Sequence, residues 1–355
     1  MGTEALSLDD ISVLLVWTAI AIYALAFIAY ALDLSRRSAL AISAQDAAAK
    51  RELVGAAVGG VSAGRAAATV PAVGGQASDA SPGRKRFVWA RIGTSLTVLA
   101  FLFHVAGDIT RGIAAERVPW ANMYEFALTG TMLIVAVYLV VLIRYDLRFL
   151  GSFITGMVAL LLGGSALPFT FYVEVVPLMD PLKSVWLIIH VFVASLATAF
   201  FALTFGLSVL QLMQSRRERK LASADRIVAG EPAATDAVTT KTGPKFLRTL
   251  PTSDALESLA YRFAIVGFIF WTFTLIAGSI WANDAWGRYW GFDTKEVWTF
   301  VIWVLYAGYI HARATRGWRG TRSAWLAIIG FVAVMFNFTI VNMFFKGLHA
   351  YSGLS

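Results

Sequence analysis

Residues 281–298 read Trp-Ala-Asn-Asp-Ala-Trp-Gly-Arg-Tyr-Trp-Gly-Phe-Asp-Thr-Lys-Glu-Val-Trp and lie between two apolar stretches that are each long enough to cross a membrane. Aromatic side chains normally anchor helix ends at the membrane–water interface. Here they alternate with glycine and with charged residues in one segment, which therefore offers flat apolar faces beside a few charges. Such a segment suits a large, planar, amphipathic ligand. An interfacial loop that binds no ligand is the alternative interpretation.

The composition predicts an all-α polytopic membrane protein. Of the 355 residues, 58% are hydrophobic and 15% are charged, which is too apolar for an ordinary soluble domain. There is no cysteine, which excludes disulfides and thiolate metal sites. A membrane span needs about 20 apolar residues. We expect eight spans, at about 11–33, 87–107, 123–143, 150–170, 185–211, 259–281, 297–312 and 323–345.

The distribution of basic residues predicts the orientation. If the N-terminus is extracytoplasmic, 24 of the 30 Lys and Arg residues fall on the cytoplasmic side, as the positive-inside rule requires. The net charge of +8 is then explained without nucleic-acid binding. Both termini and the Trp-rich segment are predicted to be extracytoplasmic. Acidic residues precede the first span, which favours a retained anchor over a cleaved signal peptide. The predicted domains are an anchor at 1–37, a disordered cytoplasmic linker at 38–86, and a membrane domain at 87–355 that contains a second linker at 216–255 and the loop at 281–298.

The four histidines are the candidate metal ligands. His104, His190 and His349 are predicted at the level of the Trp-rich segment, and His311 near the cytoplasmic face. A lone histidine at a helix end is more often a hydrogen-bonded interface residue than a ligand. Their joint placement favours ligation, because ionisable groups inside a membrane are costly and imidazole is a common axial ligand of haem. Zinc is disfavoured, since no two histidines share a helix at ligand spacing.

Residues 286–296, read as Trp-Gly-x-Tyr-Trp-x-Phe-Asp-x-Lys-Glu, resemble the WWD motif of the haem-handling protein superfamily. The closer resemblance is to the cytochrome c biogenesis family called CcsA, CcsB or ResC, which belongs to System II. The stretches at 119–125, 309–313 and 342–351 resemble family segments as well, and the resemblance covers about 90–355 without the second linker. Two positions depart from the pattern: Phe292 replaces a tryptophan and loses its indole N–H, and Thr294 replaces a proline.

The resemblance implies roles for individual residues. His190 and His349 correspond to the two axial ligands of the haem iron at the outer site, and His311 to a ligand of haem in transit. His104 is a substitute ligand or, as we favour, a structural residue. Asp293 and Glu296 alternatively cap a helix, and Arg288 and Lys295 are counter-ions for haem propionates or simple rim charges. The remaining residues expected to contact haem are Trp281, Trp286, Tyr289, Trp290, Phe292, Asp293 and Trp298.

The resemblance also implies a function. Haem b, as the transported substrate, would move to the extracytoplasmic face of a plasma or thylakoid-type membrane and be presented to apocytochrome c for thioether formation at Cys-x-x-Cys-His. The chain would be the haem-presenting subunit of a holocytochrome c synthase (haem lyase), with a ResB/CcsB-type companion and a thiol-reducing protein as partners. No residue is identified as the acid or base. The alternatives are a haem exporter or chaperone without synthase activity, and a subunit of an electron-transfer complex.

Overall fold

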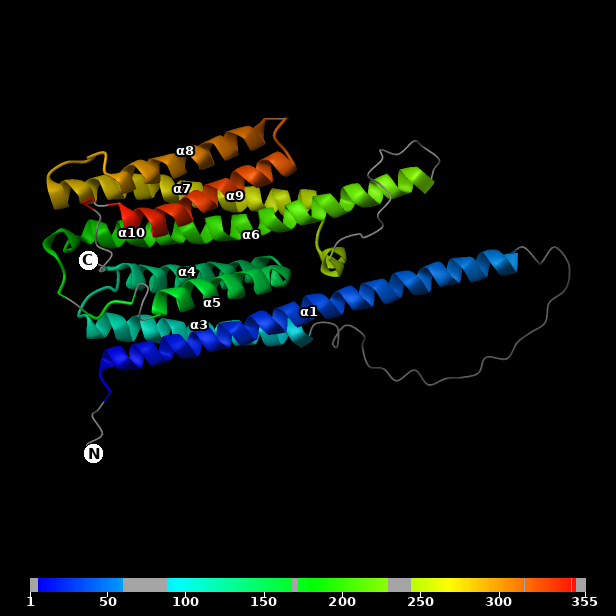
Figure 1. Ribbon diagram of the computed structural model, residues 1–355, viewed down its shortest axis with the longest axis horizontal. Coiled ribbons are helices and arrows are strands. Elements are labelled where there is room, and N and C mark those ends of the chain that lie inside the picture. The colour runs from blue at the N-terminus through cyan, green and yellow to red at the C-terminus, as the bar shows by residue number, and fades with distance from the viewer. Residues whose placement is uncertain are drawn as a thin grey trace.

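The computed structural model of the chain describes residues 6–59, 88–167, 172–175, 177–228, 244–315, 317–345 and 347–348. Within these ranges the chain forms helices and no strands, and the long helices lie side by side in one bundle (Figure 1). This confirms the predicted all-α fold class. The helices are α1 (Leu8–Gly59), α3 (Val88–Ala114), α4 (Met123–Arg144), α5 (Gly151–Ala166), α6 (Val185–Val228), α7 (Ser253–Trp286), α8 (Thr294–Ala314), α9 (Thr321–Phe336) and α10 (Asn342–Phe344).

Among the described residues, seven helical segments are long and apolar enough to cross a membrane. Six of them correspond to all or part of α1, α3, α4, α5, α6 and α7, and the seventh runs from the start of α9 to the end of α10. The seventh predicted span, 297–312, is not among these segments. It falls within α8, whose 21 residues are long enough to cross although the helix is less apolar. Every predicted span therefore corresponds to a helix.

Two helices are longer than the sequence predicted. α1 continues to Gly59, so the linker predicted at 38–86 is helical over its first part. α6 continues to Val228, well beyond the predicted end at residue 211. The physical reason is local propensity, because residues 38–54 are rich in Ala, Leu, Gln, Lys and Glu, which favour helix. The rest of the predicted linkers, at 60–86 and 229–243, lies outside the described residues.

The last predicted span, 323–345, is interrupted. α9 ends at Phe336 and is followed by a π-helical turn over Asn337–Val341 before α10 begins. A π-turn inserts an extra residue into the helical ladder and rotates the side chains that follow it, and such turns are frequent at functional sites. Here the turn lies at the same end of the bundle as the start of α6 and the α7–α8 connection (Figure 1). A cavity lies inside this end of the bundle, which we therefore call the cavity end.

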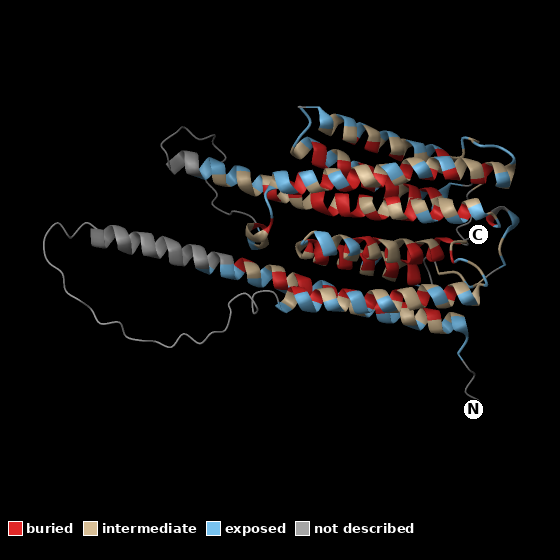
Figure 2. Cartoon of the chain, turned by 180° about the vertical axis from the view of Figure 1, so that it is seen from behind, coloured by how far each residue is buried: buried red, intermediate tan, exposed pale blue. Residues whose placement is uncertain are grey.

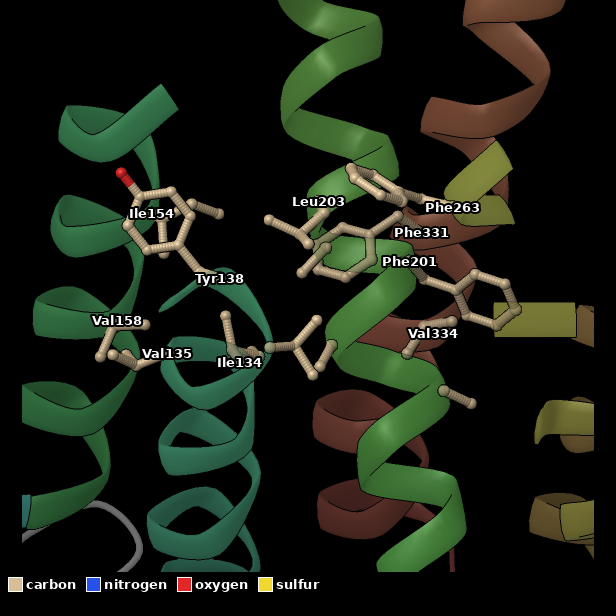
Figure 3. Close-up of a cluster of buried hydrophobic side chains, with 14 of the residues drawn as sticks. Ile134, Val135, Tyr138, Ile154, Val158, Phe201, Leu203, Phe263, Phe331 and Val334 are labelled. Atoms are coloured by element: carbon tan, nitrogen blue, oxygen red, sulfur yellow. The ribbon is translucent and has the colours of Figure 1, made fainter. Parts of the chain in front are cut away.

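The apolar core lies between α4 and α5 on one side and α6, α8 and α9 on the other. In Figure 3, Ile134, Tyr138 and Val158 of the first group face Phe201, Phe331 and Val334 of the second. The rings of Phe201 and Tyr306 stack with centroids 3.6 Å apart. Buried residues gather on the inward faces of these helices, whereas exposed residues cover the outer faces (Figure 2). Many of the exposed side chains are apolar, as expected where lipid takes the place of water.

Polar contacts connect α1 to α3 along much of their length. Ser12 Oγ donates to Gly107 O at 2.7 Å near one end, and the backbone N–H of Ala90 donates to Asp33 Oδ1 at 3.1 Å near the other. Because α1 also packs on α5, the N-terminal anchor is part of the bundle. Its description as a separate domain stays a prediction.

Candidate functional site

The Trp-rich segment is less of a loop than the sequence predicted. Residues 281–286 form the last turns of α7, which ends at Trp286 and is capped by Gly287 with φ +70°, and α8 begins at Thr294. Only residues 287–293 are outside the helices. Asp293 and Glu296 form a capping box, in which Glu296 Oε2 accepts from the backbone N–H of Asp293 at 3.1 Å and of Gly291 at 2.8 Å. The alternative interpretation of these two carboxylates as helix caps is therefore confirmed.

A cavity of about 400 Å³ lies next to this segment, inside the cavity end of the bundle. Residues from α4, α5, α6, α7, α8 and α9 line it, together with the connection between α3 and α4. Its walls are mainly apolar, and it reaches the outer surface of the bundle beside Leu160, whose exposed fraction is 78%. Its volume lies within the range of about 300–1,000 Å³ that is typical of ligand sites.

His190 lies on the wall of this cavity in the second turn of α6. Its Nδ1 is 3.0 Å from the carbonyl oxygen of Thr274, and since a carbonyl only accepts, Nδ1 carries the proton. In the neutral ring the lone pair then lies on Nε2, which is the arrangement of a ligating histidine held by a backbone carbonyl. The ring stacks on Trp281 with centroids 5.9 Å apart and planes 18° apart.

Gly278 makes this position of the imidazole possible. A Cβ on Gly278 would lie 2.6 Å from His190 Cε1 and 2.7 Å from Nδ1, closer than real Cβ contacts. Because Gly278 has no side chain, the imidazole of His190 lies directly against α7 and reaches the carbonyl of Thr274. Of the sequence-predicted site residues, the structure brings His190 and Trp281 together in the cavity wall.

The other histidines differ from His190. His104 is fully buried between α1 and α4, with Nε2 3.0 Å from Leu128 O and Nδ1 3.3 Å from the hydroxyl of Tyr23. Both ring nitrogens are thus used, which supports the structural interpretation. His311 is exposed in the last turn of α8, at the end of the bundle far from the cavity. His349, the second predicted outer ligand, lies outside the described residues.

The remaining aromatic residues of the segment lie behind or beyond the cavity wall. Trp286 packs edge-on against Trp281 at 4.9 Å, and Trp298 packs against Phe336 of α9 at 4.5 Å. Trp290 contacts the rings of Phe292 and Phe300. Tyr289 and Phe292 are 62% and 80% exposed, and Phe292 has a φ of +56°. None of these five predicted residues lines the cavity: Trp286, Tyr289, Trp290, Phe292 and Trp298.

The two basic residues of the segment have different surroundings. Lys295 lines the cavity, and its ammonium donates to Asn342 Oδ1 at 2.6 Å. Arg288 is exposed and donates to the carbonyl of Gly291 at 3.3 Å, away from the cavity. Of the two basic residues, the structure therefore places only Lys295 in the cavity lining.

Three cavity residues were not predicted to bind a ligand, and each carries a buried polar atom without a hydrogen-bond partner. They are Trp120 and Asn122 in the α3–α4 connection and Asn337 in the π-turn. The atoms are the indole Nε1, the amide Nδ2 and the amide Oδ1 respectively. The signal for the first two was the resemblance of residues 119–125 to a family segment. Asn337 had no signal in the sequence, because the π-turn that places it there was not predicted.

A buried ionic cluster fixes the α3–α4 connection beside the cavity. Arg111 is fully buried and bonds Glu125 Oε1 at 3.1 Å and Asp9 Oδ1 at 2.5 Å. Arg117 bonds Glu125 Oε2 at 2.6 Å. That carboxylate also accepts from the backbone N–H of Ala121 at 2.8 Å. Two cations thus face two anions, and the backbone between Trp120 and Asn122 is tied directly to this cluster.

Asp9 extends the cluster to the segment that follows α5. The hydroxyl of Tyr172 donates to Asp9 Oδ2 at 3.0 Å, and the guanidinium of Arg111 lies 5.9 Å from the ring of Tyr172. Burial, and then the negative charge of Asp9, raise the pKa of the Tyr172 hydroxyl, which therefore stays protonated and donates. The start of α1 thus helps to shape the cavity end.

The family model described as Cytochrome C assembly protein matches residues 120–349. The cytochrome c biogenesis protein CcsA of Guillardia theta is 34% identical over 268 residues, which are 74% of this chain and 86% of the relative. CcsA of Gloeobacter violaceus is 30% identical over 295 residues, which are 74% of this chain and 87% of the relative.

A solved structure of Cytochrome c Heme Lyase CcmF has a similar fold, with a TM-score of 0.56 and 14% identity. The match covers 95% of this chain and 48% of that chain, so this chain spans about half the length of the larger protein. At this identity the likeness concerns the fold alone. The family match covers more than half of the chain and includes its cavity histidine and its Trp-rich segment, so the chain is a membrane protein of the cytochrome c assembly family, as its resemblance to CcsA indicated.

Proposed function

We propose that the chain holds haem b in the cavity and presents it to apocytochrome c for covalent attachment. The observation that carries this proposal is His190: its Nδ1–H bond to a backbone carbonyl and its stacking on Trp281 present an oriented imidazole in the wall of an apolar cavity. A ligating imidazole fixed in this way is typical of metal and haem sites.

The chemistry of the cavity fits a haem. Its volume of about 400 Å³ and its apolar walls suit the body of a porphyrin, and Lys295 supplies a positive charge for the propionate edge. The family model for cytochrome c assembly and the relatives named cytochrome c biogenesis protein CcsA support the same cargo, because haem is the group that is attached in this process.

His349 is proposed as the second axial ligand. Gly347, two residues earlier, lies against the side chain of Asp293, leaving no room for a Cβ. Asn342, seven residues earlier, accepts the hydrogen bond of Lys295 at the cavity wall. Both contacts keep the described end of the C-terminal segment beside the cavity, which supports the resemblance-based role of His349.

His311 is proposed to bind haem in transit together with a companion membrane protein of the ResB/CcsB type. On α8 it continues an exposed row that contains Val297, Phe300 and Val304. Because these positions recur at helical spacing on one outward face, a partner helix packed along α8 would cover both the apolar row and the imidazole. A polar side chain on such a face favours a protein partner over lipid.

We propose that the cavity end is extracytoplasmic, in a plasma or thylakoid-type membrane. The support is the 24-to-6 distribution of Lys and Arg between the two sides. In this orientation haem moves from the His311 end to the cavity end, where apocytochrome c docks.

In the attachment step the histidine of Cys-x-x-Cys-His replaces one axial ligand. Each thiol then adds across a vinyl double bond, sulfur to one carbon and hydrogen to the other, without net oxidation. A thiol-reducing protein would keep the cysteines reduced. The chain contributes orientation and proximity. Asp293 and Glu296 are committed to the helix cap, so we assign neither as acid or base.

The test uses the purified full-length chain with added haem and reduced-minus-oxidised spectra. The wild type is expected to give a bis-histidine spectrum that is lost or shifted in His190→Ala and in His349→Ala and restored by imidazole. His311→Ala is the matched control, because His311 lies at the far end of the bundle and its loss should leave this spectrum unchanged. A haem spectrum indifferent to both outer substitutions would refute the proposal.

A second assay separates presentation for synthesis from simple export. The chain is expressed with its ResB/CcsB-type companion and a cytochrome c substrate, and thioether formation is followed by haem staining after denaturation. Attachment that depends on His190 supports the synthase role. Haem transfer without attachment would instead identify a haem exporter or chaperone.

A further inference from the structure

The buried polar atoms of the cavity point to how its ligand is oriented. Trp120 Nε1 and Asn122 Nδ2 are hydrogen-bond donors without a partner, although the large majority of buried side-chain polar atoms in folded proteins have one. Leaving such a donor unbonded costs about as much as losing a hydrogen bond. Both residues line the cavity, so a group bound there is the natural acceptor.

The orientation of the Asn122 amide is determined by its second role. Asn122 is the N-cap of α4, and its Oδ1 accepts from the backbone N–H of Glu125 at 2.9 Å. Since the oxygen is used for the cap, the NH₂ group is left for another partner. The side chain is only 6% exposed, so water outside the bundle does not serve as that partner. The ionic cluster around Glu125 holds this part of the chain in place.

Among the buried side-chain atoms of the cavity lining that have no hydrogen-bond partner, two are donors, Trp120 Nε1 and Asn122 Nδ2, and one is an acceptor. Lys295 adds a cationic donor from the first turn of α8, and only one of its three hydrogens is used, by Asn342. Against these stands one orphaned acceptor, Asn337 Oδ1. An excess of neutral and cationic donors in an apolar cavity is complementary to an anionic acceptor, and carboxylate is the anionic group of haem.

We propose that Trp120 Nε1–H, Asn122 Nδ2–H and the Lys295 ammonium bind the propionate carboxylates of the haem and thereby orient it in the cavity. This inference rests on the proposed function. It adds a binding role for the α3–α4 connection, which contains no histidine and lies outside the Trp-rich segment. It also predicts that the cavity distinguishes haem with free carboxylates from haem with esterified ones.

The test compares binding of haem and of haem dimethyl ester to the detergent-purified full-length chain by absorbance titration. The ester keeps the ring and the iron but lacks the negative charges. The wild type is expected to bind haem at least about tenfold more tightly than the ester, as charge-assisted hydrogen bonds predict. Equal affinities of the wild type for the two compounds would overturn the proposal without any variant.

Three variants locate the effect. Asn122→Asp keeps the cap oxygen but loses the donor, Trp120→Phe keeps a ring but loses the N–H, and Lys295→Met removes the charge. Each is expected to lower haem affinity about threefold to tenfold and so to reduce the preference for haem over the ester. Trp318→Phe and Lys183→Met, at exposed positions that are not part of the cavity lining, are the matched controls and should keep the wild-type preference.

The two proposals fail differently. If neither compound binds the wild type with a histidine-ligated spectrum, the proposed function is wrong. If both bind with that spectrum but the three variants keep the full preference for haem, the function stands and the assignment of these donors is wrong.

Discussion

The α1–α3 pair and the α6–α7 pair each contain one histidine, and the two residues show what separates a structural imidazole from a candidate ligand. His104, on α3, is enclosed, and its two ring nitrogens meet Tyr23 of α1 and Leu128 O of α4. His190, on α6, uses Nδ1 to bond Thr274 O of α7 and forms part of a cavity wall. The sequence predicted the two histidines at a similar depth in the membrane, and this similarity does not imply a similar role. The decisive difference is that one ring connects helices, whereas the other is held by a neighbouring helix beside an open space.

The largest expected effect comes from removing the imidazole of the α6–α7 pair. His190→Ala is expected to weaken haem binding by about 100-fold or more, because loss of a ligand costs at least as much as loss of its outer-shell partner. The thermal midpoint of the haem-free protein should change little. Haem titration and thermal unfolding in the same detergent measure both quantities. A haem affinity within about threefold of wild type would mean that the cavity histidine is not a ligand.

The corresponding substitution in the α1–α3 pair should have the opposite pattern. His104→Ala leaves the buried hydroxyl of Tyr23 without its partner, removes one hydrogen bond to Leu128 O and opens a void. We therefore expect a loss of about 3 kcal/mol in the free energy of unfolding. The fraction that remains folded should bind haem normally. Loss of haem binding at unchanged stability would make His104 the substitute ligand instead.

A glycine substitution tests the close contact between α6 and α7. Gly278→Ala introduces a methyl group where the ring of His190 lies, which displaces the ring from Thr274 O. We expect haem affinity to fall about tenfold, as for loss of an outer-shell contact. Gly308→Ala on α8 is the matched control, since a Cβ there meets nothing within 4 Å. Equal haem affinities of the two variants would show that the contact does not position the imidazole.

The smallest effect concerns the hydroxyl that bonds His104. Tyr23→Phe removes the contact to Nδ1 at 3.3 Å and keeps the ring, so the free energy of unfolding should fall by about 1 kcal/mol. Haem titration should give the wild-type result. A change in haem affinity would show that the α1–α3 pair affects the cavity, and it would contradict a purely structural role for His104.

Much of the fold was predictable, because long apolar stretches in a membrane protein have few alternatives to helix. All eight predicted spans correspond to helices. Helix ends were less predictable, since Ala-rich composition suits both a linker and the helical continuation of α1 to Gly59. The π-turn at Asn337–Val341 had no pattern that would distinguish it from a straight helix.

The site was predictable in part, for reasons of geometry. The Trp-rich segment and His190 were identified as candidates, yet only Trp281 and Lys295 of the segment's aromatic and basic residues line the cavity. Residue type does not reveal which rings face a cavity and which pack behind it. The donors of Trp120 and Asn122 required the fold, because their lack of partners depends on the packing of α3, α4 and the ionic cluster.

The most direct test of the account is a cryo-EM structure of the full-length chain loaded with haem. The account predicts iron density inside the cavity, ligated by Nε2 of His190, while Nδ1 keeps its bond to Thr274 O. Iron bound by His104, or located only at His311, or a haem stacked outside on Tyr289 and Phe292 would contradict it.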